Sequence, residues 1–91
     1  MNRKVRFYAT LTQDCFDNKD FFNTNLAFKN FRNANLPGSD FSEANLSFVD
    51  FRGANLRDSN FQNAKVTGTD FWGANLEGAN FEGVNLEGAN F

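Results

Sequence analysis

Residues 74–91 read ANLEGANFEGVNLEGANF, a five-residue pattern that recurs with little change. Each unit has a large apolar residue at its centre, an Asn before it, a small residue before the Asn, and a Gly two positions after the centre. The same period extends towards the N-terminus. It gives sixteen large apolar centres, which are Phe16, Phe21, Leu26, Phe31, Leu36, Phe41, Leu46, Phe51, Leu56, Phe61, Val66, Phe71, Leu76, Phe81, Leu86 and Phe91.

A five-residue period fits neither an α-helix nor a straight β-strand. On a helix each step of five advances ~140°, so the centres would spread over every face. On a strand an odd step places alternate centres on opposite faces. The centres share one core only if the chain turns a corner within each unit. The position two after the centre supplies that corner, because it is Gly, Asn or Asp in twelve of fifteen units and these residues tolerate positive φ.

Four right-angle corners close a square coil of twenty residues, and successive coils stack at the strand spacing of ~4.8 Å. Residues twenty apart then form ladders along the stack. Two ladders on opposite sides consist of Phe alone: Phe21, Phe41, Phe61 and Phe81 in one, and Phe31, Phe51, Phe71 and Phe91 in the other. Aliphatic centres form the remaining two. The sequence therefore predicts an all-β solenoid with a core of stacked phenyl rings.

From about Lys19 to Phe91 the chain resembles the pentapeptide-repeat family, whose motif is A-(N/D)-(L/F)-x-x. The units ANLEG at 74–78 and ANFEG at 79–83 match this motif in full. The resemblance implies a right-handed quadrilateral β-helix of about four coils. We expect the β-helix to occupy residues 14–91, with a short cap before it.

The composition argues against several classes of function. The chain has 91 residues, nine Lys and Arg against eleven Asp and Glu, no His, and a single cysteine, Cys15. This size allows one small domain, and one cysteine forms no intrachain disulfide. The balanced charge does not indicate a nucleic-acid or membrane surface. Without a His-paired nucleophile, a Cys/His cluster or a phosphate loop, we expect no enzyme activity, no cofactor and no metal.

The N-terminal segment differs from the repeat. In residues 1–13, Val5, Phe7, Ala9 and Leu11 alternate with other residues, which predicts a strand that caps the open end of the core. Alternatively, the basic residues of this segment form an arm that docks a partner. The segment lacks the apolar stretch of a secretory signal and no part of the chain is long and apolar enough to span a membrane, so a cytoplasmic location is expected.

One outward column of the predicted coils reads Arg32, Arg52 and Trp72, and Phe28 and Phe48 occupy the corner before it. We call these five residues the aromatic–basic patch. Exposed aromatic and Arg side chains are typical anchors of protein interfaces, and Arg52 is expected to form a cation–π pair with Trp72. In the alternative interpretation, Phe28 and Phe48 lie under the N-terminal segment and the Arg residues are solvated.

The repeat continues to the last residue, so the final coil exposes its centres Leu76, Phe81, Leu86 and Phe91. We expect homodimerisation through this coil, by analogy with family members that inhibit gyrase. A fragment of a longer solenoid, or a partner that covers this end, would leave the same pattern. The outward positions of this coil are acidic, namely Glu77, Glu82 and Glu87, and gyrase inhibitors of this family are interpreted as DNA mimics.

Three functions remain open after these observations. The preferred one is a non-enzymatic scaffold or protein-binding module that uses the aromatic–basic patch or the C-terminal coil, with a protein partner and no direct contact with nucleic acid or membrane. The alternative is a DNA mimic that binds and inhibits gyrase. The third is a structural solenoid unit without a site of its own.

Overall fold

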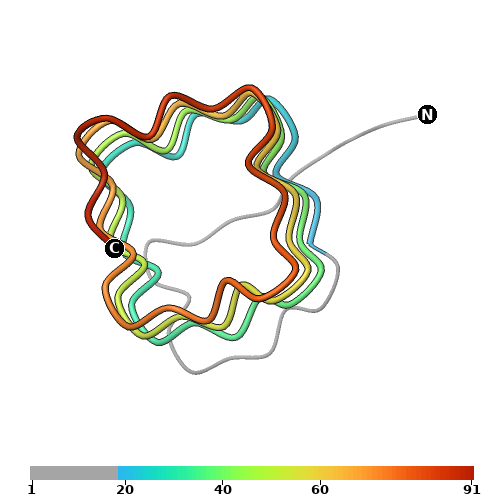
Figure 1. Ribbon diagram of the computed structural model, residues 1–91, viewed down its shortest axis with the longest axis vertical. Helices are drawn as coiled ribbons and strands as arrows, with labels where there is room; N and C mark the ends of the chain where they lie inside the picture. The colour runs from blue at the N-terminus through green and yellow to red at the C-terminus, as the bar shows by residue number, and fades with distance from the viewer. Residues whose placement is uncertain (1–18) are drawn as a thin grey trace.

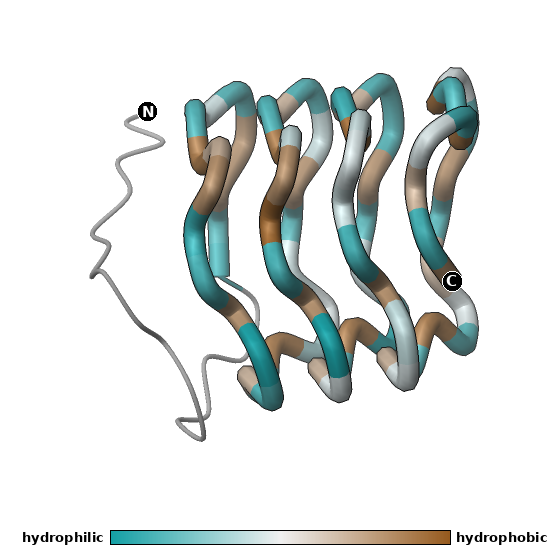
Figure 2. The backbone as a smooth tube through the Cα atoms, turned by 90° about the vertical axis from the view of Figure 1, so that its left-hand side faces the viewer, coloured by the Kyte–Doolittle hydropathy of each residue, from teal (hydrophilic) through white to brown (hydrophobic). Residues whose placement is uncertain are grey.

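The computed structural model describes residues 19–91. Within this range the backbone has no helix and no strand of several residues; two-residue turns alternate with single parallel β-bridges. Each bridge joins residues twenty apart, and the four sides begin with Asp20–Asp40, Asn25–Asn45, Asn30–Asp50 and Asn35–Asn55. The result is a four-sided solenoid (Figure 1) of nearly four stacked coils (Figure 2). The cap expected over residues 1–13, Cys15 and Phe16 lie outside the described residues.

The corners have the conformation that the sequence predicts. Every fifth residue from Asn23 to Gly88 has positive φ. Seven of these corners are Gly, and seven are other residues: Asn23, Phe28, Asn33, Glu43, Phe48, Asp58 and Asn63. Phe28, Glu43 and Phe48 therefore follow the backbone of the repeat although their residue types do not favour it.

The core consists of the predicted ladders. In one, the ring centroids of Phe21, Phe41, Phe61 and Phe81 are 5.0, 5.0 and 4.7 Å apart in turn. In the other, those of Phe31, Phe51, Phe71 and Phe91 are 5.3, 5.4 and 5.1 Å apart. The two ladders also meet edge to face across the core, for example Phe41 and Phe51 at 5.4 Å, so the rings form one continuous cluster.

Hydrogen bonds fix each coil to its neighbours. Phe51 N–H donates to Asp70 O on the next coil at 2.8 Å, and Asp50 N–H donates to Lys29 O on the preceding coil at 3.0 Å. The Asn or Asp before a centre accepts from the backbone N–H two residues on, as Asn30 does from Arg32 at 2.9 Å. These side-chain hydrogen bonds hold the turns.

Candidate functional site

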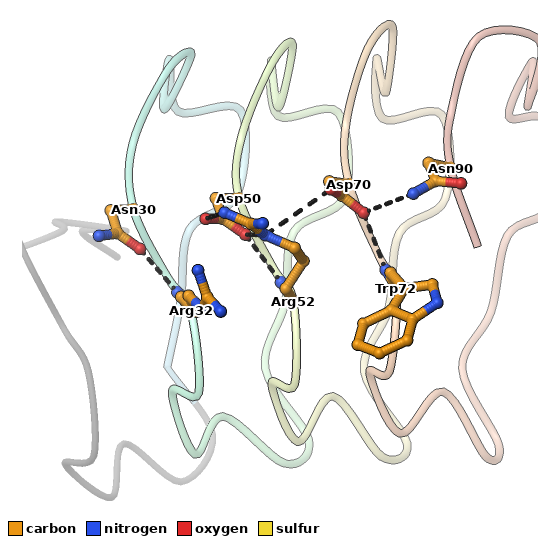
Figure 3. Close-up of polar contacts among 7 residues, drawn as sticks. All are labelled: Asn30, Arg32, Asp50, Arg52, Asp70, Trp72 and Asn90. Carbon is orange, nitrogen blue, oxygen red and sulfur yellow. Dashed lines mark hydrogen bonds and ion pairs between the residues drawn. The ribbon is translucent and has the colours of Figure 1, made fainter.

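The aromatic–basic patch lies on one side of the solenoid, which we call the patch side. Its middle column is Asn30, Asp50, Asp70 and Asn90, and the outer column Arg32, Arg52 and Trp72 runs beside it (Figure 3). The corner column before it is Phe28, Phe48, Gly68 and Gly88. The twenty-residue register thus brings all five predicted residues together.

Phe28 and Phe48 form a stacked pair on the outside of the solenoid. Their ring centroids are 5.2 Å apart with an interplanar angle of 12°, and the residues are 75% and 53% exposed. The expected exposure is confirmed for the described part of the chain. Both have positive φ, 68° and 59°. The Phe48 ring leans over Gly68, since a Cβ at Gly68 would lie 2.5 Å from Phe48 Cδ1 and Cε1.

Arg52 is held by carboxylates. Its Nε and Nη2 donate to the two carboxylate oxygens of Asp50 at 2.9 and 2.8 Å, and its Nε lies 3.7 Å from Asp70 Oδ2. The hydrogen bond from Arg52 lowers the pKa of Asp50, and the same bond raises the pKa of Arg52. The cation–π pair expected between Arg52 and Trp72 is wrong, because a bidentate bond to a carboxylate is stronger than an exposed ring contact.

The other two members of the patch carry no such partners. Trp72 is 65% exposed, and its indole lies away from the Arg52 guanidinium (Figure 3). Arg32 is exposed, and no acidic side chain within residues 19–91 forms an ion pair with it. The patch therefore presents one unpaired cation and three exposed aromatic rings around a neutralised Arg52.

The last coil exposes part of the core. Leu76 and Phe81 are partly buried, whereas Leu86 is 43% and Phe91 is 53% exposed. In lower coils the N–H of every described centre except Val66 donates to the next coil, but those of Leu76, Phe81, Leu86 and Phe91 have no backbone acceptor among the described residues. This end thus carries both apolar surface and free N–H donors.

The acidic side chains of the last coil are partly bound from below. Arg57 Nε lies 3.3 Å from Glu77 Oε1, and Gln62 Nε2 donates to Glu82 Oε1 at 3.2 Å. Glu87 is exposed, as is Lys65 on the preceding coil. The described surface is therefore a mixture of signs and not a continuous acidic strip.

The sequence analysis did not include Asp50 and Asp70 in the patch. The signal was present, since an acid lies two residues before Arg52 and another lies one coil later. Over residues 19–91, no cluster of three potential metal-ligating side chains occurs. The same range has no helix of the length and apolarity that a membrane crossing requires.

The chain is similar to several known proteins. The family model of the pentapeptide repeat region matches residues 15–91, whereas a comparison with curated proteins found no match. A pentapeptide repeat protein from the Arabidopsis thaliana thylakoid lumen is 30% identical with a TM-score of 0.78, over 90% of this chain and 54% of that one. HetL from Nostoc sp. strain PCC 7120, which is involved in heterocyst differentiation regulation, is 21% identical with a TM-score of 0.63, over 88% of this chain and 48% of that one.

A trypsin-treated variant of QnrB1, a plasmid-mediated fluoroquinolone resistance protein, is 24% identical with a TM-score of 0.49, over 100% of this chain and 52% of that one. That likeness is too loose to support a functional argument. The chain spans about half the length of each of these three proteins. The repeat, the four-sided coils and the family match agree, so the chain belongs to the pentapeptide-repeat family and folds as its right-handed quadrilateral β-helix.

Proposed function

We propose that the chain is a non-enzymatic protein-binding module and that the aromatic–basic patch is its working surface. The observation that carries this proposal is the exposed Phe28–Phe48 pair. Both residues expose large apolar rings and both occupy left-handed backbone, which is unfavourable for a bulky side chain. An exposed apolar side chain on unfavourable backbone does not stabilise the fold, and such residues are typical of binding sites.

The neighbouring side chains suit a protein partner. Trp72 and Arg32 are both exposed and are of the residue types that dominate interface energetics. Asp50 and Asp70 occupy the middle of the same side and balance the charges of Arg32 and Arg52, so the patch offers no net positive charge to phosphates. The patch therefore favours a protein over a nucleic acid.

A photoreactive phenylalanine analogue at Phe48, used in cell extract, tests this proposal. The matched position is Asp58, which is also an exposed corner with positive φ (61°) but lies on a different corner of the coil. We expect a discrete cross-linked protein from position 48, lost on adding Arg32→Glu, and none from position 58. The same products from both positions would refute the patch.

Gyrase inhibition by DNA mimicry is a second candidate. It is supported by one observation: Glu77, Glu82 and Glu87 are exposed on three sides of a coil that has no Lys or Arg. A gyrase supercoiling assay tests it directly. Inhibition at micromolar protein that is lost on replacing the three Glu by Gln would support mimicry, and no effect would exclude it.

The last coil is a second candidate contact surface, for a second copy of the chain. Its exposed Leu86 and Phe91 and the free N–H donors support this. Replacing Leu86 by Asn would then lower the solution mass. A chain with no specific cross-link, no gyrase effect and no self-association would be a structural solenoid unit without its own site.

A further inference from the structure

We propose that the patch side binds the patch side of a second copy, with the two solenoids antiparallel. The inference rests on the proposed function, because it names the partner of the same patch. It follows from how the side chains are distributed along the solenoid axis.

The two edges of the patch side change in opposite ways along the axis. The corner column has large rings at its N-terminal end and none at its C-terminal end: Phe28, Phe48, Gly68, Gly88. The outer column has Arg32, which forms no ion pair within residues 19–91, at its N-terminal end and the exposed indole of Trp72 two coils later. The N-terminal end of the patch side therefore presents the Phe pair and a cation, and the C-terminal end presents the indole.

An antiparallel copy supplies the missing elements. In this arrangement the twofold axis lies in the contact plane and is perpendicular to the solenoid axis. It passes through the coil that contains Phe48, Asp50 and Arg52. Arg32 of each copy then lies opposite Trp72 of the other, which gives two cation–π contacts. Phe28 of each copy then meets the Phe48 ring of the other copy, which covers Gly68. Four exposed Phe rings become one buried cluster.

The middle column selects the antiparallel orientation. In a parallel arrangement the twofold axis runs along the column, so that Asp50 faces Asp50 and Asp70 faces Asp70, which is destabilising. In the antiparallel arrangement Asp70 faces Asn30, whose amide can donate, and lies near Arg32 of the other copy. Only the two Asp50 side chains face each other, and Arg52 neutralises each of them.

Solution mass, measured by light scattering from low micromolar to near-millimolar protein, is the first test. We expect a dimer whose mass halves in the variant with Phe28→Asn and Phe48→Asn. Asn already occupies three other corners with positive φ, at positions 23, 33 and 63, so this variant keeps the fold, which circular dichroism checks. Leu86→Asn is the matched control: an unchanged dimer supports the patch contact, and loss of the dimer assigns association to the last coil and overturns the inference.

Engineered cysteines, in a background with Cys15→Ser, test the orientation. Arg52 lies on the twofold axis of the antiparallel arrangement, whereas Asp70 lies on that of the parallel arrangement. A residue on the axis lies next to the same residue of the other copy. We expect Arg52→Cys to give an intermolecular disulfide much faster than Asp70→Cys, and the reverse order would overturn the antiparallel arrangement. A wild-type monomer at all concentrations would overturn this inference alone if position 48 still cross-links a different protein. If the protein forms no dimer and position 48 cross-links no protein, the proposed function is refuted as well.

Discussion

Phenylalanine rings stack in two regions of the solenoid, in the core and on the outer corner, at nearly the same spacing. Phe21 and Phe41 are 5.0 Å apart in the core, and Phe28 and Phe48 are 5.2 Å apart outside. Phe21 and Phe41 are fully buried, whereas Phe28 and Phe48 are 75% and 53% exposed. Coil spacing therefore sets the stacking distance in both regions, but only the inner rings gain the free energy of burial.

The largest difference between the two regions is expected in the free energy of unfolding when one ring of each is truncated. Phe51→Ala should lower the free energy of unfolding by ~3–5 kcal/mol, because it leaves a cavity between Phe31 and Phe71 and removes edge contacts with Phe41 and Phe61. Urea denaturation at a concentration that keeps the protein monomeric measures it. Phe48→Ala is the matched control and should cost less than ~1 kcal/mol, as exposed sites do. Similar losses for both would contradict the assignment of inside and outside.

Gly73 allows the requirement for positive φ at a corner to be tested separately from side-chain packing. Its φ is +75°, and outside its two neighbours in the chain the atom nearest to an added Cβ would be Gly53 N, at 3.7 Å. Gly73→Val should therefore destabilise by ~2 kcal/mol through backbone strain alone, measured by thermal or urea unfolding. Gly73→Asn should be nearly neutral, since Asn23, Asn33 and Asn63 have the same conformation. A neutral Val variant would mean that positive φ is not required at this corner.

Most of the fold was predictable because its period repeats over the chain. The centres, the corners and both Phe ladders follow from a register of twenty that no single residue decides. The grouping of the patch followed from the same register. The direction of the Arg52 side chain could not be predicted in this way. It depends on a competition between the carboxylates of Asp50 and Asp70 and the ring of Trp72, all of which are near enough to reach the guanidinium.

Buried hydroxyls give a smaller contrast within the core. Ser59 Oγ donates to Leu36 O at 3.1 Å and accepts from Ser39 N–H at 3.2 Å. Ser39 Oγ, which is equally buried, has no hydrogen-bond partner among the described residues. Ser59→Ala should cost ~1 kcal/mol because it leaves the Ser39 N–H unpaired. Ser39→Ala should be neutral or stabilising, so equal losses in urea denaturation would show that the two hydroxyls are not distinguished.

The smallest expected effect concerns the ion pair outside the core. The pKa of Asp50 is lowered below its ordinary value of 3.8, chiefly by the hydrogen bond from Arg52. Folding therefore favours the ionised carboxylate, so the contribution of this pair is fully present above the ordinary pKa and is lost as the pH falls through the lowered one. Asp50→Asn keeps an acceptor for the Arg52 backbone N–H but removes the charge and the second oxygen, which accepts from Arg52 Nη2. Since Arg52 and Asp50 side chains are 40% and 25% exposed, the variant should lose less than ~1 kcal/mol at pH 7.

That difference should disappear at a pH well below 3.8, where wild-type Asp50 is protonated as well. Urea denaturation of both proteins at neutral and at acidic pH measures it. A gap that persists in acid would mean that Asn fails to hold the turn, and no gap at either pH would mean that the pair orients Arg52 without stabilising the fold. In that case Arg52 would belong to the patch through its position alone, and the burial of Phe51 beneath it would account for the stability of this side.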